Sequence, residues 1–515
     1  MIPALPLAAA LAGGVAHAAD DAAAPIESRL SEARTTVAPS PSLSDGLVVV
    51  AIVQTKATVT DLTSTNPFLD GQVVGLLGGT NGLTTTDEQR AVYVEQRLSP
   101  FLTWSPPILG GWASLAVGFE IDYAFGDRSY GVGGNVGGGF GGDMVNLQTR
   151  RMEATLRALR GDHDLTFHVG LQLLADGPFD PTASLPDDLL RTSGRMMIIG
   201  SEATGISAYG RVGGLAGTWL RYRLGSWTLW ESGLGEADDV TFHAADVRVE
   251  PSWIAGAGLH ALWMRDRSGG TAGTLGVGPT SALSEMQGGP RLDLRPAGVD
   301  VAPPVDTDVF WLSADASVNH RLDKGPFGAS GFVAANVGKM YLEGLRDHAI
   351  LGGFGDVEVR ARVAPGRGSV VRAEALYSTA DDPATPTYEG ALTANSWGIV
   401  GALNATHGTL LLLPDPFSID RYTAVVHDVS NSGRGVLAVT GSAGYDLVPS
   451  RLNATVGGGV ATSAGELQGA ELNAHVVADA LLFLRLGLHG GTVLGTELPT
   501  APWIVYGSLD WLVFK

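Results

Sequence analysis

Residues 111–126 alternate strictly between two kinds of side chain. The odd positions from Ala113 to Phe125 are apolar, and the even positions are small, polar or acidic. Side chains of a β-strand point alternately to its two faces, so this pattern predicts a strand with one apolar and one wet face. A tilted strand crosses the hydrocarbon core of a bilayer with about 9–11 residues, whereas strands of globular proteins more often have about 5–6. The length therefore favours a membrane barrel, with a long β-sandwich strand as the alternative.

The same alternation recurs in pairs of segments that short turns connect. Clear pairs are residues 148–159 with 165–173, 356–363 with 371–378, and 437–447 with 452–460. Longer connections lie between these pairs, at residues 64–88, 128–144, 177–195, 267–306, 380–392 and 415–434. Short turns on one rim and long loops on the other are typical of outer-membrane barrels. We therefore predict an all-β fold: one transmembrane antiparallel β-barrel over residues 46–515, with about 18 strands, or 16 as the alternative.

Residues 392–413 form an uncharged stretch that does not fit this scheme as clearly. A buried helix is one interpretation. Asn395, Asn404, His407 and several glycines interrupt the stretch too often for a spanning helix. We therefore predict a pair of strands here.

The two ends of the chain carry export signals. Residues 2–15 are apolar and uncharged, and Ala16-His17-Ala18 is a small-x-small cleavage pattern, so residues 1–18 are predicted to be a signal peptide. An anchoring N-terminal helix is the alternative. Residues 19–45, rich in Ala, Asp, Ser and Pro, are predicted to be a flexible periplasmic tail. Residues 503–514 resemble the aromatic C-terminal strand of outer-membrane barrels, which implies recognition by the barrel-assembly machinery, although Lys515 follows the final Phe514.

Composition limits the function classes. The mean hydropathy of +0.16 is too polar for a helical membrane protein, and a barrel with one wet face per strand fits it. A net charge of −20 argues against a nucleic-acid partner, and the lack of cysteine excludes disulfides and thiolate metal sites. The eleven histidines show no metal-ligand spacing, and there is no G-x-S-x-G motif. We expect no metal, no cofactor and no enzymatic activity.

The wet faces of the predicted strands hold many charged residues. An Arg that faces lipid at the bilayer midplane costs about 2–4 kcal/mol, so these side chains are expected to face the lumen while the apolar positions face outer-membrane lipid. The predicted pore-lining residues are Arg151, Glu153, Arg157, Arg221, Arg223, Glu358, Arg360, Arg362, Arg372, Glu374 and Arg485. They could form an electrostatic lining that selects solutes, or a network that only fills the lumen.

One hairpin allows a prediction of register. If residues 356–377 pair symmetrically about Gly366, Arg372 lies opposite Arg360 and Glu374 lies opposite Glu358. The arginines then form a positive layer near the turn, which favours the passage or binding of an anion.

The general layout resembles Gram-negative outer-membrane porins. The stretch from His407-Gly408-Thr409 through Pro414-Asp415-Pro416 to Asp420-Arg421-Tyr422, with the Arg-rich inner face, distantly resembles the alginate-export barrels. The resemblance implies an 18-stranded monomeric barrel with a charged pore, in the bacterial cell outer membrane.

Three functions follow from the sequence, in order of preference. The first is a channel for passive diffusion of small hydrophilic or anionic solutes. The second is a structural or interaction barrel with a blocked lumen, whose surface loops bind partners or polymer. The third is an outer-membrane hydrolase. The conductance of single refolded molecules distinguishes the first from the other two.

Overall fold

The structure is a computed structural model. It describes residues 46–65, 74–77, 83–87, 90–126, 145–161, 163–175, 198–213, 218–231, 239–252, 255–269, 305–319, 322, 324–344, 346–364, 368–382, 384–394, 408–415, 419, 422–426, 429–431, 433–481 and 483–514. The predicted signal peptide and tail lie outside the described residues. No helix in these ranges is long and apolar enough to cross a bilayer.

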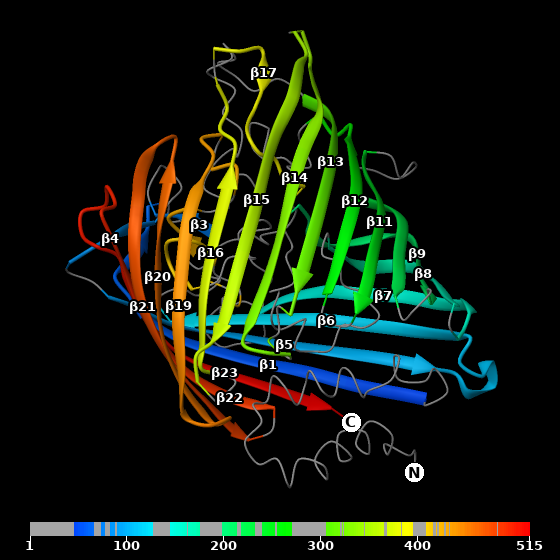
Figure 1. Cartoon of the computed structure of the whole chain (residues 1–515), viewed down its shortest axis with the longest axis horizontal. Helices are drawn as coiled ribbons and strands as arrows, with labels where there is room; N and C mark the ends of the chain where they lie inside the picture. Colours follow the sequence, from blue (N-terminus) through cyan, green and yellow to red (C-terminus); the bar gives the residue numbers. More distant parts are fainter. Residues whose placement is uncertain are drawn as a thin grey trace.

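Eighteen long strands form one closed antiparallel barrel (Figure 1). The first half consists of β1 (Gly46–Thr60), β5 (Ala91–Ser105), β6 (Ala113–Gly126), β7 (Val145–Leu159), β8 (His163–Ala175), β9 (Gly200–Gly213), β10 (Trp219–Trp230), β11 (Val240–Ser252) and β12 (Ala255–Asp266). The second half consists of β13 (Val305–Val318), β14 (Phe327–Leu342), β15 (His348–Arg362), β16 (Val370–Ser378), β19 (Leu437–Val448), β20 (Leu452–Ser463), β21 (Glu466–Leu481), β22 (Leu484–Leu494) and β23 (Trp503–Phe514).

The ring closes where the first strand meets the last. β1 pairs with β5 on one side and with β23 on the other, in a register that runs from Val50 opposite Phe514 to Thr60 opposite Ile504. An even number of strands lets every neighbouring pair of the ring run antiparallel. The predicted barrel of about 18 strands is therefore confirmed.

Small elements decorate the ring. They are β2 (Leu62–Ser64), β3 (Val74–Leu76), β4 (Leu83–Thr85), β17 (Thr387–Tyr388), β18 (Tyr422–Ala424) and the 3-10 turn η2 (Pro107–Leu109). β2 pairs with β4, β3 pairs in parallel with β18, and β17 lies beside β15.

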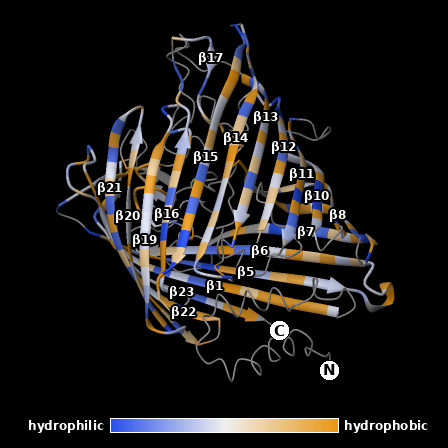
Figure 2. Cartoon of the chain, in the orientation of Figure 1, coloured by the Kyte–Doolittle hydropathy of each residue, from blue (hydrophilic) through white to orange (hydrophobic). Residues whose placement is uncertain are grey.

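Side chains alternate between an outer and an inner face along the strands. Figure 2 shows the alternation as hydrophilic and hydrophobic bands. On β12, Leu259 is 63% exposed, whereas the next residue, His260, is buried. The apolar positions predicted to face outward behave in the same way: Leu115, Phe167, Val359 and Leu486 are exposed, and Phe119, Leu171 and Leu484 are half-buried.

The two rims of the barrel differ. We call the rim with the short connections, such as residues 160–162 and 449–451, the turn end, and the opposite rim the loop end. At the loop end the inner face is apolar on several strands, among them β13, β15 and β16. Val309, Trp311, Phe354 and Leu376 are all inner-face residues and are at most 4% exposed. The expectation of one wet face per strand is therefore wrong for these stretches at the loop end.

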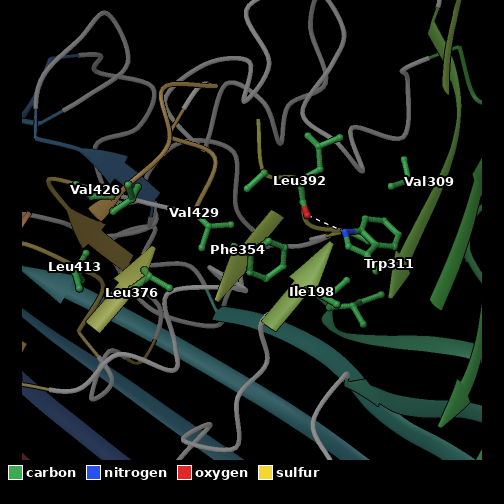
Figure 3. Close-up of a cluster of buried hydrophobic side chains, with 14 of the residues drawn as sticks. Ile198, Val309, Trp311, Phe354, Leu376, Leu392, Leu413, Val426 and Val429 are labelled. Atoms are coloured by element: carbon green, nitrogen blue, oxygen red, sulfur yellow. Dashed lines mark hydrogen bonds between the residues drawn. The ribbon is translucent and has the colours of Figure 1, made fainter. Parts of the chain in front are cut away.

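The segments that cover this inner face come from the long connection between β16 and β19. Figure 3 shows Leu392, Leu413, Val426 and Val429 packed with wall residues such as Phe354. The indole N–H of Trp311 donates to the carbonyl oxygen of Leu392 over 2.8 Å. We call the buried connection residues Leu392, Leu410, Leu411, Leu412, Leu413, Val426 and Val429 the apolar plug.

The predicted strand pair over residues 392–413 is wrong. Where the structure describes it, at residues 392–394 and 408–413, the chain forms no strand. Residues 410–413 are at most 1% exposed. Residues 410–413 are apolar because they pack inside the barrel and not because they face lipid.

Candidate functional site inside the barrel

The predicted pore-lining residues all lie on barrel strands. Arg151, Glu153 and Arg157 are on β7, Arg221 and Arg223 on β10, Glu358, Arg360 and Arg362 on β15, Arg372 and Glu374 on β16, and Arg485 on β22. Exposed apolar residues flank them on the opposite face, as Met152 and Leu156 do on β7. The structure therefore brings these charged side chains to the inner face, mostly in the half of the barrel toward the turn end.

A bulge adds an unpredicted arginine to the wall. The register between β6 and β7 shifts at Gly118, so that both Arg150 and Arg151 point inward. Arg150 lies 2.7 Å from the carboxylate of Glu202 and 3.5 Å from that of Glu120. Arg151 pairs with Glu153, which also lies 3.3 Å from the ring Nδ1 of His168. Strict alternation hides such a bulge, because it assigns neighbouring residues to opposite faces.

A chain of ion pairs crosses four strands in the next part of the wall. Arg223 contacts Asp246, whose carboxylate lies 2.7 Å from Nδ1 of His260. Nε2 of the same ring lies 2.9 Å from Asp315, and Asp315 contacts Arg248. Both imidazole nitrogens thus face a carboxylate, which favours the doubly protonated ring.

Glu250 extends this chain to another predicted residue. Its carboxylate lies 2.9 Å from Nε of Arg221 and 3.4 Å from Nε of Arg248. Asp246, Arg248 and Glu250 alternate along β11, and this spacing is the sequence signal that could have predicted them as inner-face residues.

The β15–β16 hairpin has the predicted register. Arg360 lies opposite Arg372, and Glu358 lies opposite Glu374. The carboxylate of Glu358 contacts Arg360 and lies 3.5 Å from Nε of Arg372, so one acid serves both arginines. Arg362 donates to the carbonyl oxygen of Leu322.

Two further predicted residues differ in their partners. Arg485 pairs with Asp479 at 3.1 Å. Arg157 makes no ion pair with a described residue, and its buried Nε atom has no hydrogen-bond partner among them. Among the described residues, the wall therefore contains arginines that pair with a carboxylate as well as Arg157, which does not.

Residues 408–415, which we call the docking segment, are bound to the inner wall at several points, the first of which is the carboxylate of Glu471. The two oxygens of Glu471 accept the backbone N–H groups of Leu410, Leu411 and Leu412 over 2.6, 2.8 and 2.6 Å. Asn473, two residues along β21, donates to the carbonyl oxygen of Gly408 over 2.6 Å. These bonds satisfy backbone groups that would otherwise be buried without partners.

The far end of the docking segment is held by an ion pair. Nζ of Lys56 lies 2.9 Å from the carboxylate of Asp415, and each side chain is only 4% exposed. Lys56 also lies 4.0 Å from the ring centre of Tyr506 on β23. The ring of His489 stacks on the ring of Tyr506, with 4.5 Å between the two ring centres.

A histidine pair lies beside these residues. The Nδ1 atoms of His475 and His489 are 2.8 Å apart, and their Nε2 atoms lie near Asn473 and Ser508. No group of three or more His, Asp or Glu in the described part of the chain is arranged to hold a metal ion.

Sequence reasoning missed Lys56 and Asp415. Lys56 is the single charged residue of β1, on its wet face, and Asp415 stands between two prolines. Each is unusual in its segment, but nothing in the pattern connects residues 359 positions apart.

Outside the strands, Asp61 ties the end of β1 to the start of β23. Its carboxylate accepts the backbone N–H of Trp503 over 2.9 Å, and it is 4% exposed. Burial raises the pKa of Asp61, and the hydrogen bond from Trp503 opposes that change.

No protein-family model matches the chain, and no curated protein matches it in sequence. Three solved structures with a similar fold are outer-membrane proteins of Pseudomonas. OccK9 (OpdG) of Pseudomonas aeruginosa is 12% identical with a TM-score of 0.47, over 92% of this chain and 100% of that chain. OpdK of the same species, solved with vanillate, is 10% identical with a TM-score of 0.46, over 91% and 99%.

A BenF-like porin from Pseudomonas fluorescens Pf-5 is 11% identical with a TM-score of 0.46, over 91% of this chain and 99% of that chain. At these identities and scores the likeness carries no argument about function. The architecture of this chain rests on its own strand pairing.

Proposed function

We propose that this protein is an outer-membrane channel through which small hydrophilic or anionic solutes diffuse passively. The observation that carries the proposal is the accessibility of the charged inner wall. The side chains of Arg151, Arg360, Arg372 and Arg221 face the lumen and are 25, 22, 27 and 38% exposed. Charges that only filled a core would be sealed from solvent, as Lys56 is.

The distribution of apolar residues supports the membrane part of the proposal. Leucines and valines remain exposed all around the outer face, among them Leu224, Leu312, Val333 and Leu472 at 56–65%. Such a surface is an aggregation hazard in water and is stable in lipid. We also propose a location in the bacterial outer membrane, with residues 1–18 as a signal peptide and β23 as the strand that the assembly machinery reads.

The apolar plug favours a second candidate function. Leu411, Leu412 and Leu413 are fully buried inside the loop end, and the docking segment is fixed at both ends. A barrel closed in this way would act through its surface loops and would carry no current. The resemblance to alginate-export barrels has no support from the comparisons, and no substrate is taken from it.

The conductance of single refolded molecules tests the proposal. Chain 19–515 is refolded in detergent and its closure is checked by the heat-dependent shift on a gel. It is then added to a planar bilayer in 1 M KCl, where a channel gives discrete current steps. A folded, inserted barrel without steps would support the blocked candidate and overturn the channel.

A further inference from the structure

The outer wall of β10–β14 has a shallow apolar groove of about 740 Å³. Its floor is a set of small residues on neighbouring strands: Ala245, Ala261, Ala314 and Ala335. Its sides are the larger Leu224, Leu259, Leu312 and Val333, which are 56–64% exposed. These strands are adjacent in the ring (Figure 2), and residues of all five line the same groove.

Strand pairing explains why the wall is hollow here. Ala245 lies opposite Ala261, and Ala314 lies between Leu259 and Val333 in register. Small alanines therefore alternate with larger branched side chains across these strands, and the hollow lies over the alanines. The inner faces of the same strands carry the Asp246–His260–Asp315 chain.

An aromatic ladder lies directly beyond the groove on the loop side. The ring of Trp263 stacks on His243 at 4.9 Å and on Phe310 at 5.4 Å, the latter with planes only 3° apart. Trp263 is two residues from Ala261 on the same outer face. Aromatic residues of this kind mark the boundary between hydrocarbon and headgroups on barrel walls.

The next outer row carries charge. Arg265 lies opposite Asp308, which in turn lies opposite Lys339. The carboxylate of Asp308 forms an ion pair with Arg267 at 2.6 Å. The ammonium group of Lys339, at an exposed position, lies 2.6 Å from the carboxylate of Asp347. Arg265 makes no ion pair with a described residue. A cation thus remains available just above the aromatic ladder, on a chain with a net charge of −20.

We propose that this groove binds one anionic, phosphate-bearing membrane lipid, with an acyl chain in the groove over the alanines and the phosphate at Arg265. The inference rests on the membrane location proposed above and not on conductance. The order of the rows supports the proposal. The alanines would contact the acyl chain, the aromatic ladder would lie at the interface, and Arg265 would lie at the level of the headgroup. A second copy of the barrel is the competing occupant.

Native mass spectrometry of the detergent-purified barrel tests the proposal with phosphatidylglycerol and phosphatidylcholine as probes. The wild-type barrel is expected to retain one phosphatidylglycerol molecule in preference to phosphatidylcholine. Ala261→Phe fills the groove and should remove the retained lipid. Ala257→Phe lies on the same face of β12 outside the groove, and it should behave as wild type.

Arg265→Gln should keep acyl binding and lower the preference for phosphatidylglycerol about fivefold, which corresponds to the roughly 1 kcal/mol that one basic side chain contributes at an anionic membrane surface. Equal lipid retention by wild type and Ala261→Phe would overturn the proposal. So would a dimer mass for wild type that Ala261→Phe abolishes, since the groove would then belong to a second copy. Lipid retention is measured in detergent, independently of conductance. A barrel that binds lipid but conducts no current would therefore contradict the proposed channel function and leave the lipid proposal supported.

Discussion

The ammonium group of Lys56 and the carboxylate of Asp415 lie 2.9 Å apart inside the barrel, although 359 positions separate them in the chain. Each charge is buried, and removing one partner of such a pair costs about 3–5 kcal/mol because the other stays buried without compensation. We expect Asp415→Asn to lower the temperature at which the barrel unfolds on a gel. The double variant Lys56→Met with Asp415→Leu should recover most of the loss. Single variants as stable as wild type would contradict a functional ion pair here.

Glu471 should control how far the docking segment narrows the lumen. Glu471→Ala removes the acceptor of three backbone N–H groups, so the segment should leave the wall and the mean single-channel conductance should change. Glu466→Ala, at the exposed start of the same strand, is the matched control. If Glu471→Ala and Glu466→Ala conduct alike, the docking segment does not lie in the ion path.

The positive layer of the β15–β16 hairpin should set ion selectivity. Replacing Arg360 and Arg362 with Gln is expected to shift the reversal potential in a KCl gradient toward that of a cation-selective channel. Arg451→Gln, at an exposed turn between β19 and β20, controls for the loss of charge as such. Unchanged selectivity with a collapse of thermal stability would mean that the arginine row is only structural.

The two faces of β6 should react with different reagents. Leu115 is 48% exposed on the outer wall, and its neighbour Ala116 is 5% exposed on the inner face. In vesicles, Leu115→Cys should be labelled by a lipid-soluble maleimide and protected from a water-soluble one. Ala116→Cys should not react with the lipid-soluble reagent. The reverse pattern would show that the faces are exchanged.

Asp61 should give the barrel a small acid preference. Its pKa is raised by burial, so the folded barrel binds this proton more tightly than the unfolded chain does. Stability is therefore greater at mildly acidic pH, below the raised pKa, and falls as the carboxyl ionises toward neutral pH. Asp61→Asn should flatten this dependence, measured as the unfolding temperature from pH 4 to pH 8. Asp61→Ala should be less stable throughout, because the N–H of Trp503 loses its acceptor.

Period-two patterning predicted the ring, its strand count and the register of the β15–β16 hairpin, because each depends on local alternation and turn position. Leu115 and Val359 face outward, as the pattern requires. Arg150 was missed because a one-residue bulge reverses the faces of β7 before residue 151. The alternation of apolar and polar residues along β7 does not reveal such an insertion.

The apolar plug could not be predicted from alternation. Trp311 follows Phe310 on β13, and both are apolar although they lie on opposite faces. An apolar side chain at such a position can face either lipid or a packed interior. The partner of Trp311 is the backbone of Leu392, 81 residues away. Only the closed ring brings these groups together, and local alternation therefore predicts strands for the uncharged stretch 392–413.

The wall residues that bind the docking segment, residues 408–415, come from the first strand of the barrel and from strands near the end of the chain. Lys56 belongs to the first strand, Tyr506 to the last strand, β23, and Glu471 to β21. These groups come together only when β1 pairs with β23 and the ring is complete. Until that moment the leucines at 410–413 have no complete cavity to enter. We therefore expect this segment to bind the wall only after the ring has closed, so that in an unclosed barrel its leucines would be accessible to a chaperone or protease.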